Sequence, residues 1–245
     1  MWWIARDSAE VEDQVRILAR IFSAVRPQSL PFASFCRPIQ LILSGTKRRE
    51  LQDEGDDMTG KTRCAWVPAN KPDYVHYHDT EWGRPVHDDQ RLFEMLILEG
   101  AQAGLSWYTI LQRREGYREA FKNFDPKKVA RMTDAQLEDV LANGAIIRNR
   151  LKVFSTRKNA QVFLAIQKEF GSFDAYVWGF IGGKPKVNRP KTMKDVPATT
   201  PESDALSKDL KKRGMSFVGS AIIYAYMQAV GLVNDHTVDC FKAAR

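Results

Sequence analysis

Near its C-terminal end the sequence reads Arg213-Gly214-Met215-Ser216-Phe217-Val218-Gly219, a glycine-bounded segment between two helical patterns. The first pattern covers residues 201–213 and follows a threonine, so a typical N-cap precedes a proline at the first helical position. The second pattern runs from about residue 219 to 230 and ends at a glycine. The sequence therefore predicts a helical hairpin, in which Phe217 and Val218 pack between the two helices.

The hairpin also has a chemical interpretation. Gly219 and Ser220 stand where a helix begins, and the free backbone N–H groups of a helix start bind phosphate oxygens well. Basic residues gather at the same corner: Lys208, Lys211, Lys212 and Arg213. Such a corner suits contact with the DNA backbone, which carries no sequence information. The alternative is an ordinary corner between two helices with a solvated basic end, and this segment taken alone favours that alternative.

Helical signals dominate the chain from residue 63 onward. Apolar residues recur at helical spacing within residues 89–99 and 147–170. Residues that typically cap helices precede several apolar segments: Ser106, Asp125 before Pro126, Thr133 and Ser172. Residues 182–201 are rich in proline and suit a surface excursion. Because no strand pattern of any length is present, the predicted fold class is all-α.

Residues 1–57 have a different character. Short apolar segments separated by prolines are followed by a polar stretch over residues 45–57. Acidic residues near the start argue against a signal or transit peptide. We therefore expect residues 1–57 to form a poorly structured N-terminal extension. The alternative is that the protein naturally starts at Met58 and that the gene has been predicted too long. Residues 58–245 are expected to form the functional domain.

Charge and composition narrow the class of protein. The net charge is +7, and residues 1–57 hold 8 basic and 9 acidic residues, so that residues 58–245 carry a net charge of +8. A basic domain favours polyanions such as nucleic acid. No segment approaches the roughly 20 apolar residues that span a bilayer, so we expect a soluble protein without a membrane partner. Three cysteines are too few for a disulfide framework, which favours a cytoplasmic location.

The histidines and cysteines of the basic domain indicate a possible metal site. His236 and Cys240 are four residues apart, so on a helix both would face one ion, and Cys64 lies fourteen residues before His78. Together they would form a closed tetrahedral site that joins the start of the domain to its end. The long gap between the pairs is not that of a zinc finger, and buried free cysteines are the alternative. Spacing does not choose between His78 and His76.

Aromatic residues gather around one carboxylate. Glu99 and the amide of Gln102 stand between an apolar helix and a glycine-interrupted turn that leads to Trp107. Neighbouring segments add further aromatic side chains: Trp66, Tyr74, Tyr77 and Trp82. Aromatic residues usually belong to the core, and that is the default for Trp82. A flat cationic ring, such as an alkylated purine, would however be held by stacking on tryptophan and by a carboxylate that accepts its hydrogen bonds.

Five motifs in this order carry a resemblance to a known family. They are Arg63-Cys64-Ala65-Trp66-Val67, Tyr77-His78-Asp79-Thr80-Glu81-Trp82-Gly83, Leu98-Glu99-Gly100 with Leu105-Ser106-Trp107, Ser203-Asp204-Ala205-Leu206-Ser207-Lys208, and Gly231-Leu232-Val233-Asn234-Asp235-His236. Over about residues 62–240 the sequence resembles DNA-3-methyladenine glycosylase I, of the helix-hairpin-helix DNA glycosylase superfamily. Residues 1–57 have no counterpart in that family.

The resemblance implies a fold, a metal and a substrate. The fold would be that of a helix-hairpin-helix glycosylase, with a structural Zn²⁺ that joins the N- and C-terminal ends of the domain. The implied zinc ligands are Cys64, His78, His236 and Cys240. The implied partner is double-stranded DNA that contains alkylated adenine, bound by a monomer that is associated with the bacterial nucleoid through DNA. The damaged nucleotide would rotate out of the duplex into a pocket.

The resemblance also implies roles for individual side chains. At the catalytic site, Glu99 and Tyr77 would hydrogen-bond the flipped 3-methyladenine and Trp107 would stack on it. The base pocket would further include Trp66, Tyr74 and Gln102. The implied DNA contacts are Gly104, Leu105, Lys212, Arg213, Gly219 and Ser220. Of these, Leu105 or its neighbour Gly104 would fill the gap that the flipped nucleotide leaves in the duplex.

The implied chemistry is hydrolysis without a covalent intermediate. A methyl group at N3 makes adenine a cationic leaving group, so stabilisation of the separating charges supplies most of the acceleration and a water attacks C1′. Lyase activity is not expected, because Ser220 stands where a nucleophilic lysine would follow the hairpin. Nor is Asp235 expected to be catalytic, because the plausible register places Asn234 at that position.

Two other functions compete with this interpretation. One is a non-catalytic, zinc-stapled helix-hairpin-helix module that only binds DNA. The other is a broader alkylpurine glycosylase that also removes 7-methylguanine. The carboxylate of Glu99 disfavours both, because a binding module does not need it and because it would repel the oxygen that guanine presents.

Overall fold

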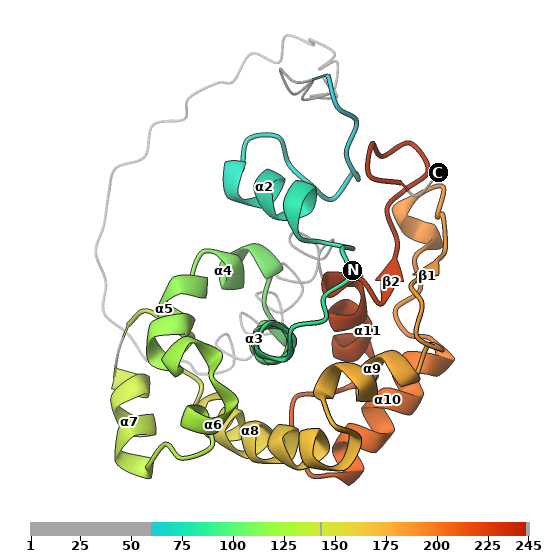
Figure 1. Cartoon of the computed structure of the whole chain (residues 1–245). Helices are drawn as coiled ribbons and strands as arrows, with labels where there is room; N and C mark the ends of the chain where they lie inside the picture. Colours follow the sequence, from blue (N-terminus) through green and yellow to red (C-terminus); the bar gives the residue numbers. More distant parts are fainter. Residues whose placement is uncertain (1–59, 143, 244–245) are drawn as a thin grey trace, which may run out of the picture. The chain divides into compact units, whose positions relative to one another are not determined.

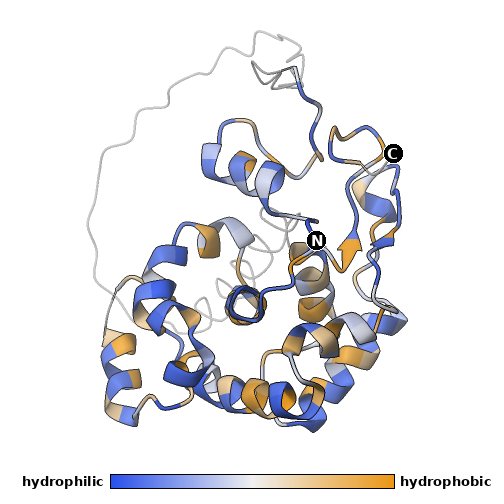
Figure 2. Cartoon of the chain, in the orientation of Figure 1, coloured by the Kyte–Doolittle hydropathy of each residue, from blue (hydrophilic) through white to orange (hydrophobic). Residues whose placement is uncertain are grey.

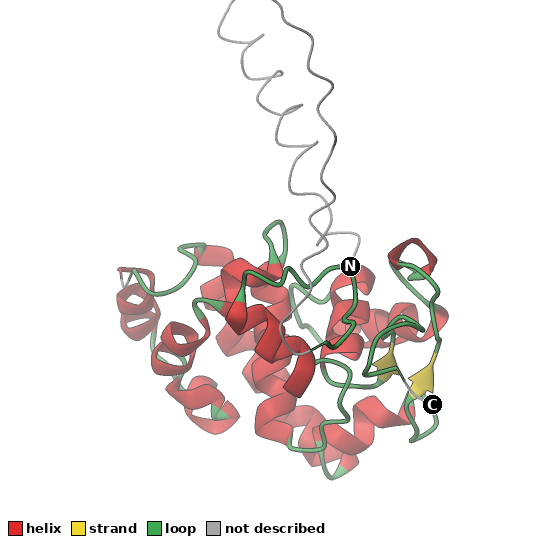
Figure 3. Ribbon diagram, turned by 90° about the horizontal axis from the view of Figure 1, so that it is seen from above, coloured by secondary structure: helices red, strands yellow, loops and turns green. Residues whose placement is uncertain are grey.

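The structure is a computed structural model that describes residues 60–142 and 144–243. The predictions for residues 1–57 lie outside the described residues. Within them the chain is mostly helical, as Figure 3 shows, and this confirms the predicted helical class. One correction is needed, because β1 (Lys186–Val187) and β2 (Val233–Asn234) form a parallel pair. Strands of two residues are too short to produce the alternating pattern by which a strand is recognised in sequence.

The helices follow one another with short connections in most places. The α-helices are α2 (Pro72–Thr80), α3 (Asp89–Gln102), α4 (Trp107–Leu111), α5 (Arg114–Ala120), α6 (Pro126–Val129), α7 (Asp134–Ala142), α8 (Arg150–Phe170), α9 (Phe173–Gly179), α10 (Pro201–Lys212) and α11 (Ser220–Ala229). Two 3₁₀ helices are η1 (Lys122–Phe124) and η2 (Met193–Asp195). None of the helices in the described ranges has the length and apolar character of a membrane span.

The predicted capping residues begin the helices as expected. The side chains of Ser106, Asp125, Ser172 and Thr200 accept hydrogen bonds from backbone N–H groups in the first turns of α4, α6, α9 and α10. Thr133 and Gln136 exchange the two hydrogen bonds of a capping box before α7. After Ser106 the chain forms two short helices, α4 and α5. Helix α8 begins later than its apolar pattern, because Asn149 caps it.

Helix α3 lies at the centre of the described domain. Figure 1 shows it nearly end-on among the other helices, and its residues from Leu92 to Gln102 are all buried. It packs against α4, α8, α9 and α11. Figure 2 colours most of α11 as hydrophobic, in agreement with its buried position beside α3. The end of α3 is therefore held in place by the core, and this end carries Glu99.

The predicted hairpin joins α10 and α11, which pack against each other. Val218 is buried, and its carbonyl accepts a hydrogen bond from the Ser207 hydroxyl at 2.6 Å. Phe217 contacts α3 so closely that a Cβ at Gly100 would lie 3.2 Å from the Phe217 Cβ. The amide of Asn159 in α8 binds both the N–H and the carbonyl of Ser216, each at 2.9 Å. The hairpin is thus fixed against α3 and α8 as well as between its own helices.

Candidate active site and metal centre

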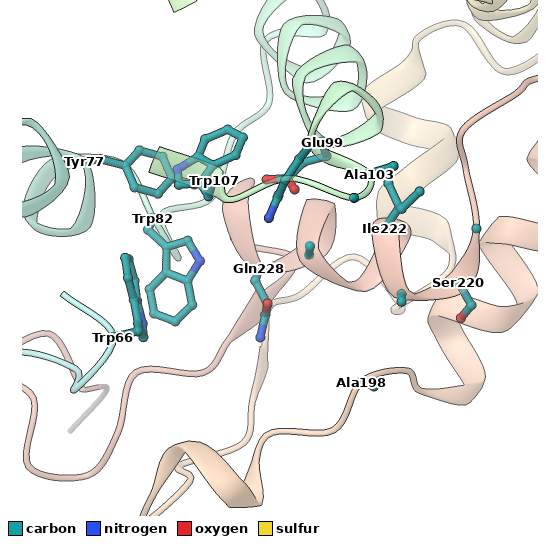
Figure 4. A pocket seen from close by; sticks show the side chains of 15 residues that line it. Trp66, Tyr77, Trp82, Glu99, Ala103, Trp107, Ala198, Ser220, Ile222 and Gln228 are labelled. Carbon is teal, nitrogen blue, oxygen red and sulfur yellow. The ribbon is translucent and has the colours of Figure 1, made fainter. Parts of the chain in front are cut away.

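A pocket of about 340 Å³ lies where the end of α3 meets α2, α4 and α11. This volume is in the range of small-molecule sites. Figure 4 shows aromatic side chains on one side of the pocket and residues of α11 on the other. The lining residues are Trp66, Tyr77, Trp82, Glu99, Gln102, Ala103, Gly104, Trp107, Ala198, Gly219, Ser220, Ala221, Ile222, Ala225 and Gln228.

Glu99 is the one carboxylate among the residues that line this pocket. Glu99 is only 4% exposed, and its carboxylate makes no hydrogen bond to another residue in the described ranges. Burial raises the pKa of Glu99 from its ordinary value of 4.5 to about 8. A buried carboxylate without a partner is costly, and such groups cluster at functional sites. The arrangement therefore favours a ligand that brings a hydrogen-bond donor or a positive charge to Glu99.

Two aromatic rings stand beside this carboxylate. The centroids of the Tyr77 ring of α2 and the Trp107 ring of α4 are 5.2 Å apart, and both residues are buried. Ser106 caps α4 through the N–H of Thr109 at 3.2 Å, which makes Trp107 the first residue of that helix. Burial, followed by the charge of Glu99, raises the pKa of Tyr77 well above its ordinary value. The Tyr77 hydroxyl therefore stays protonated and available as a donor.

The other expected pocket residues lie in different surroundings. Trp66 and Gln102 line the pocket. Tyr74 is not among the lining residues, because its buried ring packs against Trp66 with centroids 5.1 Å apart and against Tyr108 at 5.5 Å. Tyr74 thus supports the aromatic wall from behind.

The residues expected to contact DNA fall into three groups, of which the turn after α3 and the start of α11 come first. Gly104 and Leu105 lie in the turn after α3, where Gly104 is exposed with a φ of +80° and Leu105 is half-buried. Gly219 begins α11 without a side-chain cap, and both Gly219 and Ser220 line the pocket. The turn and the helix start therefore lie at the same pocket.

The basic residues of the hairpin differ from each other. Lys212 is exposed. The Arg213 guanidinium instead donates from Nε to Asp209 at 2.6 Å and from both Nη atoms to Glu169 at 2.6 and 3.0 Å. All three of its nitrogens are thus engaged within the protein. Arg213 thus ties the end of α10 to α8 and contributes to the rigidity of the hairpin.

Sequence reasoning missed the part of the pocket that α11 lines beyond Ser220. Gln228 lines it, and its Nε2 donates to Asp235 at 2.6 Å. A single amide within an otherwise apolar helix was the signal that could have found it. Asp235 is buried and also accepts from the Tyr224 hydroxyl and the Asn188 amide, each at 2.7 Å. These three hydrogen bonds indicate that Asp235 has a structural role.

The four candidate metal ligands lie together in the structure. Their ligand atoms are all within 4.8 Å of one another, and all four residues are buried: Cys64, His78, His236 and Cys240. His76 is exposed and is not part of this cluster. The structure thus resolves the choice between the two histidines that spacing left open.

Contacts behind the histidines orient them toward the two sulfur atoms. Nδ1 of His78 bonds to Asp79 at 2.8 Å, and Asp79 is itself held by Arg63 at 2.7 Å. Nε2 of His236 lies 3.2 Å from the carbonyl of Trp82. The opposite nitrogens, Nε2 of His78 and Nδ1 of His236, each lie 3.5 Å from the Cys240 sulfur. Such outer partners are characteristic of histidines that bind a metal.

The two thiols interact as well. Hydrogen bonding between the sulfur atoms raises the pKa of Cys64 and lowers the pKa of Cys240, so one of the pair ionises readily. Thiolate and imidazole are the ligands that zinc sites use in proteins. The donor set, its burial and its outer partners therefore fit a closed metal centre.

A helical hairpin beside an aromatic pocket with one buried carboxylate fits the class of helix-hairpin-helix DNA glycosylases that the sequence resembles. Comparison with known proteins identifies the family within this class. The sequence model described as Methyladenine glycosylase matches residues 66–243. The chain belongs to this methyladenine glycosylase family.

Individual relatives agree with this assignment. The chain is 49% identical to a DNA-3-methyladenine glycosylase of Haemophilus influenzae over 179 residues. The matching region covers 73% of this chain and 96% of the relative. A crystal structure of a 3-methyladenine DNA glycosylase I matches with a TM-score of 0.73 and 48% identity over 75% of this chain and all of that one. A single-residue variant of such an enzyme, solved in complex with 3-methyladenine, matches with a TM-score of 0.72 and 36% identity, over 75% of this chain and 98% of that one.

Proposed function

We propose that this protein is a monofunctional DNA glycosylase that excises 3-methyladenine from alkylated DNA, the first step of base excision repair. The observation that carries the proposal is Glu99, a buried carboxylate without a partner among the described residues, set beside two aromatic rings. Membership of the methyladenine glycosylase family supports it, as does the relative that was solved with 3-methyladenine. Each part of the pocket then has a role in recognising a flat cationic base.

Recognition begins with charge. The base of an N3-methylated adenosine is cationic, and a positive charge next to Glu99 favours its carboxylate form. Glu99 then accepts a hydrogen bond from the 6-amino group, while Tyr77 donates a hydrogen bond and Trp107 stacks on the ring. Trp66 and Gln102 complete the base pocket.

The flipped state needs contacts outside the pocket. Leu105, on the exposed turn with Gly104, fills the space that the nucleotide leaves in the duplex. The N–H groups at the start of α11 hold a phosphate near Gly219 and Ser220, and exposed Lys212 adds attraction for the backbone. The unstacking cost is lowest for a damaged base, which adds selectivity.

Hydrolysis follows from the charge of the leaving group. The bond between the base and C1′ breaks, the base leaves as a neutral molecule, and the sugar takes on oxocarbenium character. A water then bonds to C1′ and releases one proton to solvent. A negative Glu99 stabilises the positive charge while the bond breaks. No lysine lines the pocket in the described part of the chain, which supports hydrolysis without a Schiff base.

We infer that the metal centre holds Zn²⁺ through Cys64, His78, His236 and Cys240. When bound, the ion supplies no chemistry to the reaction and closes the two ends of the domain together. His78 on α2 and Cys240 near the C-terminus are separated by more than 150 residues. The functional domain is proposed to span residues 58–245, with double-stranded DNA as its partner.

The test is base release from methylated duplex DNA, separated by chromatography into 3-methyladenine and 7-methylguanine. Both the full chain and a chain that begins at Met58 are assayed. Selective release of 3-methyladenine by both is the expected result. Absence of release from folded, metal-loaded samples of both would refute the glycosylase and leave a DNA-binding module. Release of both bases would refute the selectivity that we attribute to Glu99.

A further inference from the structure

The turn after α3 is held from outside by one side chain of α8. The ammonium of Lys152 donates hydrogen bonds to the carbonyls of Ala101 at 2.8 Å and Ala103 at 2.6 Å. The last carbonyls of a helix have no partner within it, and a cation there also interacts favourably with the helix dipole. Lys152 is about fifty positions away in sequence, so this contact ties two separate elements together.

Local hydrogen bonds satisfy the neighbouring carbonyls and leave these two for Lys152. The carbonyl of Gly100 accepts from the N–H of Ala103 at 3.3 Å, and that of Gln102 accepts from the N–H of Leu105 at 2.6 Å. Beyond this point the turn is open at Gly104, whereas Leu105 packs in part against the core. A Cβ at Gly104 would meet no atom within 4 Å, because the tip of the turn is open.

The same face of α8 also holds the hairpin. Asn159 follows Lys152 by seven residues, which is two helical turns, so both side chains lie on one face. Asn159 bonds to both backbone polar groups of Ser216. The Lys152 ammonium also lies 5.9 Å from the centre of the Phe217 ring. One rigid helix thus sets the distance between the turn at the pocket and the hairpin.

We propose that Lys152 is a positioning residue for nucleotide flipping, which fixes Gly104 and Leu105 relative to the phosphate-binding hairpin. The inference rests on the proposed function. A flipped nucleotide is held at its base by the pocket and at its phosphates by the hairpin, while Leu105 occupies the gap in the duplex. The pocket, the hairpin and Leu105 must therefore keep a fixed geometry relative to one another. Small displacements of such groups are costly for catalysis. Lys152 touches neither the base nor the reacting atoms and acts through the turn.

The main variant is Lys152→Met, which removes the ammonium and retains much of the aliphatic stem. Lys168→Met is the matched control, because it removes the same charge from an exposed position of the same helix. We expect Lys152→Met to lower kcat/KM for 3-methyladenine release from duplex DNA by about tenfold or more. Binding of free 3-methyladenine should stay near that of the wild type, because Glu99, Tyr77 and Trp107 remain in place. Lys168→Met should retain wild-type values in both assays.

A double-mutant cycle separates positioning from a general structural role. If Lys152 acts through the turn, adding Lys152→Met to Leu105→Ala should lower kcat/KM little further, because Leu105→Ala has already removed the side chain that fills the gap in the duplex. Independent effects that add in the double variant would overturn the proposal. So would an equal loss of free-base binding, or activity of Lys152→Met equal to that of Lys168→Met.

Two further variants keep the test decisive. Lys152→Arg retains a cationic donor and should recover part of the activity. If Lys152→Met does not fold, Lys152→Gln carries the same test, and wild-type activity in that variant would contradict the proposal. Wild-type enzyme is assayed first, so that a failure of the proposed function is seen before any variant is compared.

Discussion

Glu99 sets the electrostatics of the pocket. Burial raises its pKa to about 8, so near neutral pH the empty pocket holds it largely protonated. A cationic base reverses this preference, because its charge compensates the carboxylate. A neutral base brings no such compensation. The same residue therefore favours an alkylated cationic purine over the normal bases of DNA.

This interpretation predicts the pH dependence of excision. The profile of kcat/KM reports groups of the free enzyme, so that of the wild type should rise with pH and level off above about 8, where Glu99 is ionised. Glu99→Gln should lower kcat/KM by about a hundredfold or more and should lack that rising limb. The measurement is base release between pH 5 and 9, with circular dichroism as the control for folding. Normal excision by a well-folded Glu99→Gln protein would exclude the assigned role.

The raised pKa also has a consequence for stability. The folded chain keeps a proton on Glu99 up to about pH 8, whereas the unfolded chain loses it near 4.5. The folded state thus binds more protons between these values, and its stability decreases as the pH rises through this window. Glu99→Gln removes the group that causes this decrease of stability with pH. The stability of the variant should therefore exceed that of the wild type by a margin that grows from pH 5 to pH 8. Urea unfolding across this range tests it, and parallel curves for the two proteins would contradict it.

At the scale of elements, α8 connects the turn after α3 to the hairpin, the two parts that we propose contact DNA. Asn159→Ala removes both hydrogen bonds to Ser216 and leaves the backbone of the hairpin without these partners. A loss of about 1–3 kcal/mol in the free energy of unfolding is expected. Affinity for undamaged duplex DNA should also decrease, because the start of α11 is less well positioned. Urea unfolding and fluorescence anisotropy measure the two effects.

The control for this prediction lies on the same helix. Gln161 is exposed and makes one long bond, at 3.3 Å, to the carbonyl of Ala130. Gln161→Ala should therefore leave both stability and DNA binding close to the wild type. Equal effects of the two substitutions would mean that Asn159 has no special connection to the hairpin.

The elements that could be predicted from sequence are those with local causes. Caps such as Ser106 and Thr200 act within one turn of their own helix, so the sequence shows them directly. The β1–β2 pair joins residues that are 47 positions apart, and no local pattern predicts it. The pairing of Arg213 with Glu169 was hidden for the same reason, because Glu169 lies 44 residues before it, whereas its other partner, Asp209, is only four residues away. Tertiary contacts decide such features, and a single sequence does not display them.

At the scale of the whole molecule, the proposed metal centre and the pocket share their supports. Helix α2 presents Tyr77 to the pocket and the next residue, His78, to the metal cluster. The ring of Trp82 lines the pocket and lies 4.6 Å from that of His236. The ligand types were visible in the sequence, but only the fold shows that the two pairs meet. Closure of the domain and the shape of the aromatic wall are therefore linked.

This link predicts the effect of removing one ligand. Cys240→Ala should lose bound metal, because three donors hold zinc less tightly than four, and metal-binding energy contributes directly to folding. If about 3 kcal/mol is lost, the melting temperature should decrease by roughly 6–12 °C for a domain of this size. The preference for 3-methyladenine over 7-methylguanine should remain, because Glu99 and Trp107 do not belong to the cluster. His76→Ala, at an exposed histidine outside the cluster, is the matched control. Metal content and thermal unfolding are measured on both variants, and unchanged melting with full zinc content in Cys240→Ala would remove Cys240 from the ligand set.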